Sequence, residues 1–340
     1  MTSSITIVIQ MVIVGIDIGA TWTRIALADH NGKIISKIKK IATLQEGEDK
    51  FDMLRRIELT VRELSTQIGS DIEAIGVGTI GPLDLKKGVI LHTPNLPIEN
   101  VPILRYLRER FRVPVYMVND CTAAVIGEKF FGVGRHYDNI VYITISTGIG
   151  GGAIVDGNVL FGKDGNAVEI GHVVVDHSGK LKCGCGGYGH WEAYTSGKNI
   201  GKFADLLLRE FFSADEYKLS VLSKCVESPV DLKYSHITKA ARANDSLALR
   251  ILDIVANVNA AGLATVINSY DPDVVSFGGA VILENPPELL LEPLKEKVVK
   301  FIINREPEIL ITPLGEDIVL MGAVAIALDP EVIPKKFREL

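Results

Sequence analysis

Continuous apolar runs alternate along the chain with segments of helical periodicity. Apolar runs bounded by Gly, Asp, Asn or Pro predict buried strands, at residues 12–18, 24–29, 34–40, 74–78, 114–118, 140–146, 153–155, 159–160 and 273–277. Apolar residues spaced three and four apart predict helices, at 50–68, 102–111, 121–130, 198–222, 247–267 and 320–328. Strands that alternate with helices predict an α/β fold.

One local pattern occurs in both halves of the chain. In each half a strand leads into a Gly/Thr turn, a second strand, an Asn/Gly turn and a third strand; the Gly/Thr turns are residues 17–21 and residues 146–150. Two unrelated hairpins would give the same pattern. The repeated turn chemistry favours a duplication, and we name the two segments the first and second glycine turns.

The glycine turns are candidates for binding phosphate. Glycines let backbone N–H groups approach phosphate oxygens, and threonine hydroxyls add donors; the residues concerned are Gly19, Thr21, Thr147, Gly148 and Gly150. Asp17, at the end of a buried strand, can hold Mg²⁺ directly or through water. Tight hairpins with a capping aspartate are the alternative. Facing each other across a cleft, the two turns would clamp ATP.

Two better-known phosphate motifs also match by letter but lack the necessary context. Gly76–Gly81 fits the dinucleotide fingerprint, yet Pro82 follows and no helix is predicted next. Gly157–Asp164 resembles a P-loop, but Asp164 replaces the Ser or Thr that would hold Mg²⁺. We discount both motifs.

Asn119 and Asp120 end one predicted strand and open a helix, where α/β proteins commonly bind ligands. A carboxylate there can accept a hydroxyl proton in phosphoryl transfer. An ordinary helix N-cap is the alternative for this pair.

A candidate metal site lies in a Gly-rich stretch. Cys183 and Cys185 stand two apart, with His172 before them and His190 after them. Two thiolates and two imidazoles make a Cys₂His₂ zinc site. A core histidine and a reduced Gly-rich turn are the alternatives, but the joint occurrence favours zinc.

Composition narrows the classes of partner and compartment. The chain has 340 residues, 36 Lys+Arg and 42 Asp+Glu, a net charge of −6, and 47% apolar residues. This length predicts two globular domains. We expect no nucleic-acid or membrane partner because no basic cluster is dense enough. The apolar start at residues 5–16 lacks a basic flank and is too short to span a bilayer, so we expect a cytoplasmic protein with reduced cysteines.

These residues together resemble the ROK family of repressors and sugar kinases, from Val12 to Leu328. The most specific part is Glu169-Ile170-Gly171-His172 followed by Cys-x-Cys-Gly-x-x-Gly-x-x-Glu192. The resemblance implies a two-lobed actin-like ATPase (ribonuclease H-like) fold with duplicated lobes and a central cleft. We expect a small lobe at 11–118 plus the helix at about 318–340, and a large lobe at 119–317.

The resemblance also implies site residues. Its sugar-contacting positions are Asn119, Asp120, Glu169, His172 and Glu192, with Asp120 as catalytic base and His172 also a zinc ligand; Gly78, Thr79 and Asn95 match nearby parts of the sugar site, and Gly278 and Gly279 match the adenosine side. Two positions depart from the family pattern. His190 replaces a third cysteine, and the first glycine turn carries Ala20 and Trp22 where the family has glycine and lysine.

The expected activity is therefore ATP-dependent phosphorylation of a hexose at its 6-hydroxyl by a glucokinase or broad hexokinase. ATP, Mg²⁺ and a structural Zn²⁺ are the expected ligands, and a homodimer or homotetramer is the expected assembly. An N-acetylmannosamine or other amino-sugar kinase is the alternative within the class. A sugar-responsive repressor is the alternative outside it; the acidic charge and the lack of a basic recognition helix disfavour it.

Overall fold

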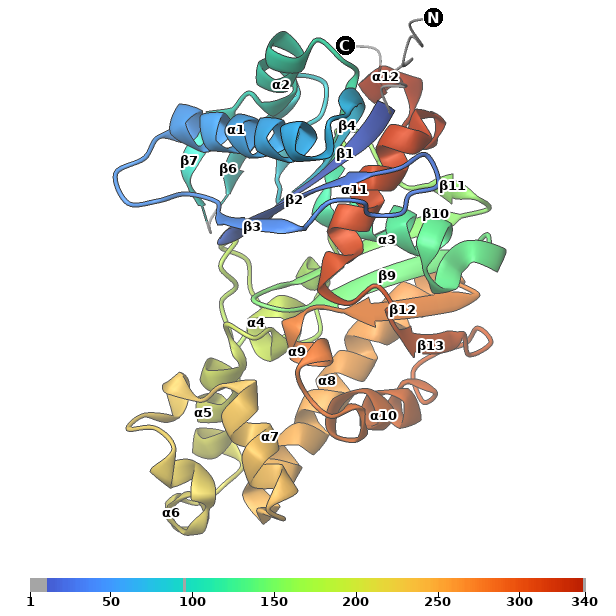
Figure 1. Ribbon diagram of the computed structural model, residues 1–340. Helices are drawn as coiled ribbons and strands as arrows, with labels where there is room; N and C mark the ends of the chain where they lie inside the picture. The colour runs from blue at the N-terminus through green and yellow to red at the C-terminus, as the bar shows by residue number, and fades with distance from the viewer. Residues whose placement is uncertain (1–10, 94–95, 339–340) are drawn as a thin grey trace, which may run out of the picture. The chain divides into compact units, whose positions relative to one another are not determined.

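The computed structural model describes residues 11–93 and 96–338, and Figure 1 shows its elements. The contacts divide it into two compact units. The first holds the chain up to Gly132, Asn158–Ala167 and the chain from Asp317 onward; the second holds Val133–Gly157 and Val168–Glu316. The expected lobes differ from these units at two segments. The helix that follows Asn119 and the segment 158–167 were expected in the large lobe, but both group with the first unit.

The first unit is built on a sheet with the strand order β3-β2-β1-β4-β8. Its elements are β1 (Met11–Ile18), β2 (Trp22–Ala28), β3 (Lys39–Ala42), α1 (Lys50–Ile68), β4 (Asp71–Thr79), β5 (Leu83–Asp84), β6 (Val89–Thr93), β7 (Leu96–Val101), α2 (Ile103–Phe111), β8 (Val115–Asn119), α3 (Asp120–Phe131), β11 (Asn158–Val159), α11 (Ile318–Leu328) and α12 (Lys335–Arg338). Strands β5, β6 and β7 form a separate small sheet.

The second unit repeats this arrangement. Its elements are β9 (Ile140–Ile145), β10 (Ile149–Val155), α4 (Trp191–Thr195), α5 (Ile200–Glu210), α6 (Ala214–Leu219), α7 (Tyr234–Arg242), α8 (Ser246–Tyr270), β12 (Val274–Gly278), α9 (Ala280–Leu283), α10 (Pro287–Val298) and β13 (Glu308–Ile311). The order β10-β9-β12-β13 matches β2-β1-β4-β8, and in each sheet an antiparallel hairpin is followed by parallel strands. The predicted duplication and the α/β class are confirmed.

Helix α11 packs directly on the first sheet because glycines leave room for it. A Cβ on Gly76 would lie 1.8 Å from the backbone oxygen of Ala323, and one on Gly15 would lie 2.7 Å from the Val324 side chain. Gly15 and Gly76 are register partners on β1 and β4. Side chains there would push the helix off the sheet.

Several predicted strands begin a few residues away from their expected bounds, among them β10, which begins at Ile149 and not at 153. Two predicted elements differ more. The strand expected at 34–40 begins only at Lys39, because the Ser36 hydroxyl accepts a hydrogen bond from the Leu27 N–H at 2.9 Å and replaces a strand-to-strand bond. The helix expected at 198–222 divides into α5 and α6. Ser213 starts the second helix with a capping box, in which the Glu216 N–H donates to the Ser213 hydroxyl and the Ser213 N–H to the Glu216 carboxylate.

Helix α8 is the one helix of the described chain that is long and apolar enough to cross a membrane. Its most apolar window has a mean hydropathy of 1.5, and 61% of that window is buried. It packs against α4, α7 and α10, so its apolar surface is covered within the second unit, as in the core helix of a globular domain.

Candidate active site

Parallel pairing brings several predicted site residues to one edge of the first sheet. The register pairs Asp17 of β1 with Gly78 of β4, and Thr79 of β4 with Asn119 of β8. All four residues lie at or next to the carboxyl ends of their strands, where α/β sheets bind ligands. Residues more than 100 positions apart in sequence therefore share one edge.

Asp17 is a buried carboxyl group in a cluster of charges. Its Oδ2 lies 3.2 Å from Arg24 Nη1, and Arg24 Nε lies 3.9 Å from Asp317 Oδ1. Burial raises the pKa of Asp17 to about 7, and the nearby Asp120 and Asp317 carboxylates add to this while Arg24 opposes it. Asp17 and the nearby Asp120 and Asp317 thus bring carboxyl groups together, and carboxylate oxygens are ligands that Mg²⁺ prefers.

Asn119 and Asp120 stand at the beginning of α3. Asn119 is the N-cap, and its Oδ1 accepts a hydrogen bond from the Cys121 N–H at 2.9 Å. The same N–H lies 2.8 Å from Asp120 Oδ1. The capping role that was the alternative for Asn119 is thus present, and the Asp120 carboxyl group lies beside the N-terminus of α3.

The backbone of the first glycine turn is fixed by Thr43, which the sequence did not single out. The Thr43 hydroxyl donates to the Gly19 carbonyl at 2.7 Å and lies 3.0 Å from the Thr23 hydroxyl, and the Thr43 N–H donates to the Thr21 carbonyl at 2.9 Å. Both threonine side chains are fully buried. Gly19 and Thr21 therefore have their carbonyls bonded on the protein side of the turn.

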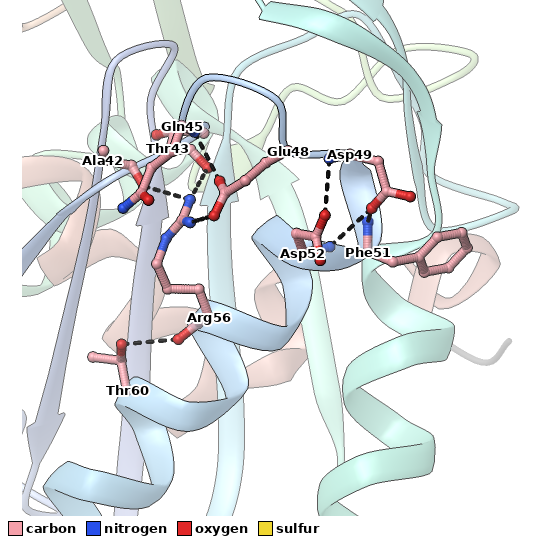
Figure 2. A network of polar contacts seen from close by, with 9 residues as sticks. All are labelled: Ala42, Thr43, Gln45, Glu48, Asp49, Phe51, Asp52, Arg56 and Thr60. Carbon is pink, nitrogen blue, oxygen red and sulfur yellow. Dashed lines mark hydrogen bonds and ion pairs between the residues drawn. The ribbon is translucent and has the colours of Figure 1, made fainter.

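Arg56 of α1 holds Thr43 in place (Figure 2). Its Nη2 donates to the carbonyls of Ala42 at 2.9 Å and Thr43 at 2.8 Å, and its Nη1 pairs with Glu48. Contacts of the two Nη groups with these three acceptors orient the segment between β3 and α1. The buried Nε has no hydrogen-bond partner among the described residues. No local sequence pattern marks this role, because it depends on where the helix meets the segment.

Directly after the first glycine turn, Trp22 stands where the ROK pattern has lysine. The Trp22 side chain is exposed. The Lys40 ammonium lies 5.5 Å from the centroid of the Trp22 ring, within range of a cation–π contact. A lysine thus lies beside Trp22 although it comes from the neighbouring strand β3.

The structure gives Gly78 and Thr79 packing roles. A Cβ on Gly78 would lie 2.7 Å from Val319 and 3.0 Å from Ala123, so this glycine lets α11 and α3 approach the sheet. The Thr79 side chain is fully buried. Asn95 lies outside the described residues.

In the second unit, the second glycine turn and the predicted adenosine-side glycines lie at one sheet edge. Thr147 and Gly148 connect β9 to β10, and Gly150 lies in β10 opposite Thr144. Gly278 at the end of β12 is the register partner of Thr144 as well. Gly279 has φ 86°, and a Cβ there would lie 2.5 Å from the Ile145 carbonyl. Only glycine fits this position.

Glu169, His172 and Glu192 lie together in the second unit. His172 Nε2 is 3.7 Å from Glu169 Oε2, and its Nδ1 is 3.8 Å from Cys183 Sγ. Glu192, in the first turn of α4, accepts a hydrogen bond on Oε2 from the Ile149 N–H at 3.0 Å. His172 thus presents one ring nitrogen to a carboxylate and the other to a thiol.

The predicted metal residues form a compact cluster. The ligand atoms of His172, Cys183, Cys185 and His190 all lie within 4.8 Å of one another. Cys185 Sγ is 3.3 Å from His190 Nδ1, and Cys183 Sγ is 3.8 Å from His172 Nδ1. Tetrahedral zinc, with Zn–S about 2.3 Å and Zn–N about 2.0–2.1 Å, separates neighbouring S and N ligands by roughly 3.5 Å. The four residues fit a zinc ion.

The electrostatics of this cluster also fit a metal. Burial raises the pKa of the Cys183 thiol to about 11, so its thiolate requires a cation close by. Burial and the nearby His172 lower the pKa of His190, which favours the neutral imidazole that binds metals.

Asp176 fastens the segment between His172 and Cys183 to α4. Ser178 donates to it at 2.5 Å, Tyr194 of α4 donates to its other oxygen, and the Lys180 N–H donates at 3.2 Å. Partial burial alone would raise the pKa of Asp176, but these hydrogen bonds lower it to about 2. In turn, burial and the hydrogen bond to Asp176 raise the pKa of Tyr194 to about 12.

Comparisons with known proteins place these features in a family. The sequence pattern of the ROK family matches residues 13–330. A glucokinase of Pyrobaculum calidifontis is 38% identical over 95% of this chain and 97% of its own length. The ROK hexokinase structure from Thermus thermophilus has a TM-score of 0.77 at 30% identity, covering 93% of this chain and 98% of that one.

A ROK glucokinase from Streptomyces griseus, solved in complex with glucose and AMPPNP, has a TM-score of 0.74 at 32% identity over 93% of this chain and 99% of that one. These likenesses confirm the predicted actin-like ATPase fold. The chain belongs to the ROK family.

Proposed function

We propose that this chain is an ATP-dependent hexose kinase that transfers the γ-phosphoryl group to the 6-hydroxyl of its sugar. The observation that carries this proposal is the edge of the first sheet, where two carboxyl groups have different environments. Asp17 is buried with a pKa of about 7, whereas Asp120 stands at the N-terminus of α3. One carboxyl group is thus buried and paired with Arg24, while the other stands at the start of a helix, and we assign them different tasks.

We assign Asp120 as the general base. Its carboxylate accepts the proton of the sugar 6-hydroxyl as that oxygen forms a bond to the γ-phosphorus. The bond from the γ-phosphorus to the bridging oxygen breaks, and ADP leaves with the electron pair. The products are ADP and the sugar 6-phosphate, with the proton on Asp120.

The glycine turns are assigned to the phosphates of ATP. Backbone N–H groups near Gly19 and Gly148, with the Thr21 and Thr147 hydroxyls, can donate to phosphate oxygens where charge develops. Gly278 and Gly279 are assigned to the adenosine side. This assignment agrees with the net charge of −6, because local donors and not a basic surface meet the anionic substrate.

Metal ions have two separate roles in the proposal. Asp17 would hold Mg²⁺, which neutralises charge on the phosphates during transfer. His172, Cys183, Cys185 and His190 would hold Zn²⁺, which fixes the loop that carries the sugar residues.

The remaining sugar hydroxyls are assigned to Asn119, Glu169, His172 and Glu192. Carboxylates and an imidazole suit this task because each sugar hydroxyl is both a donor and an acceptor. The glucokinase relatives support glucose as the first substrate to test, and an amino sugar such as N-acetylmannosamine is the alternative.

A coupled assay of ADP formation over glucose, mannose, N-acetylglucosamine and N-acetylmannosamine tests the proposal. We expect sugar-dependent ADP formation, greatest with glucose. A greater kcat/KM with N-acetylmannosamine would favour the amino-sugar alternative, and ADP formation that no sugar stimulates would refute both.

A further inference from the structure

Glu192 is bonded to the second glycine turn. Its Oε2 accepts the hydrogen bond from the Ile149 N–H at 3.0 Å, at the point within the turn where β10 begins. Its Oε1 lies 3.7 Å from Cys183 Sγ. One side chain, which the proposed function assigns to the sugar, thus contacts both the turn assigned to phosphate and the zinc cluster.

Gly148 leaves room for the Glu192 side chain because it has no side chain of its own. A Cβ on Gly148 would lie 2.4 Å from Glu192 Oε2, 3.3 Å from Cδ and 4.0 Å from Oε1, and these carboxyl atoms are the three nearest heavy atoms that it would meet. The φ angle of Gly148 is not among the positive values of the described glycines. The absence of a side chain at Gly148 therefore leaves room for the Glu192 carboxyl group in its hydrogen-bonded position, and no positive φ calls for glycine there.

The backbone that carries Glu192 cannot shift easily to relieve such a clash. On one side, Trp191 Nε1 and the Thr195 hydroxyl donate to Asn259 Oδ1 of α8 at 2.8 and 2.6 Å, all within the buried interior. On the other side, the Gly197 N–H donates to the Ser146 carbonyl of the glycine turn at 2.7 Å. Helix α4 is held at both ends, so a change at Gly148 must move the carboxyl group.

We propose that the second glycine turn is also part of the hexose site: Gly148 and the Ile149 N–H position the Glu192 carboxylate for the sugar. This inference rests on the proposed function, which supplies the sugar. Because the same turn is assigned to phosphate, binding of the sugar at Glu192 and binding of the nucleotide at the turn are coupled through a direct contact. Such coupling is equal in both directions.

The test is a Gly148→Ala variant, with hexose binding measured by calorimetry in the absence of nucleotide. We expect its sugar affinity to fall by about tenfold or more, since a carboxylate displaced from its hydrogen-bonding position loses a charge-assisted contact. The matched control is Gly19→Ala in the first glycine turn, where the added Cβ meets only the Trp22 carbonyl at 3.0 Å. We expect that control to bind sugar within about twofold of the wild type.

A second measurement separates a local clash from general damage. Gly148→Ala is placed in a Glu192→Ala background, and thermal unfolding is followed in all four proteins. The single Gly148→Ala change should lower the unfolding temperature, and the same change should have little effect once the Glu192 carboxyl group is gone. Equal effects in both backgrounds, or an unchanged sugar affinity in Gly148→Ala, would overturn the inference. A wild-type protein that binds no hexose would instead refute the proposed function.

Discussion

The Thr43 hydroxyl offers a sharp test of how the first glycine turn is held. Thr43→Val keeps the shape and the N–H bond to Thr21 but removes the hydroxyl that bonds Gly19 at 2.7 Å and Thr23 at 3.0 Å. Both hydroxyls are fully buried. Loss of a buried partner costs about 1–3 kcal/mol, so we expect roughly 2–3 kcal/mol less stability.

The same change should affect nucleotide binding, because the Gly19 carbonyl is no longer fixed. We expect the KM for ATP to rise several-fold while the sugar affinity without nucleotide stays within about twofold of the wild type. The assays are urea denaturation and initial rates with varied ATP. Thr43→Ser restores the hydroxyl and should restore the KM.

Thr60→Val is the matched control for this experiment (Figure 2). The Thr60 hydroxyl is also buried and donates to the Arg56 carbonyl at 2.9 Å, but it touches no part of the glycine turn. We expect a loss of about 1 kcal/mol at most and an unchanged KM. A Thr43→Val protein that matched Thr60→Val in both stability and KM would refute the reasoning.

Three further predictions concern catalysis, metal and pH. Asp120→Asn should lower kcat by about 10²–10⁴-fold with little change in sugar affinity, measured by the coupled assay and calorimetry; a near-normal kcat would reject Asp120 as the base. Purified protein should contain about one zinc per chain by elemental analysis, and Cys185→Ser should lose it whereas Cys225→Ser, at an exposed cysteine elsewhere, should not; a zinc-free wild type would contradict the site. Asp176→Asn should destabilise the fold by about 1 kcal/mol at pH 7 after allowance for solvent screening. Because the folded pKa of about 2 lies below the ordinary 3.8, that difference should be full above pH 4 and shrink as the pH falls toward 2; a difference that did not change over this range would contradict the assignment.

Most of the predicted strands and helices occur in the structure because the sequence patterns that indicate them are local. Buried strands read as continuous apolar runs, and α1 was expected at the residues where it occurs. The two misplaced elements depend on single serines. Ser213 and Glu216 form a capping box that the spacing S-x-x-E could have revealed, whereas the Ser36 bond to Leu27 requires the two segments to be already side by side.

Candidate site residues could be singled out from the sequence only where their position next to a strand, a helix or another candidate residue indicates a chemical role. Asp120 was singled out from its place between a strand and a helix, and the four His and Cys residues that cluster in the structure from their joint occurrence in one stretch. Which residues share the edge with Asp17 follows from strand register, which no single segment encodes. Thr43 and Arg56 were missed for the same reason: each acts on a segment that is distant in sequence.

The most direct test of the central claim is phosphorus NMR of the products formed from glucose and MgATP, with 6-deoxyglucose as a parallel substrate. We expect ADP and glucose 6-phosphate in equal amounts from glucose, and no sugar phosphate from 6-deoxyglucose, which lacks the hydroxyl that we propose Asp120 deprotonates. Sugar phosphate formed from 6-deoxyglucose, or ADP formed with free phosphate as its only counterpart, would contradict the account.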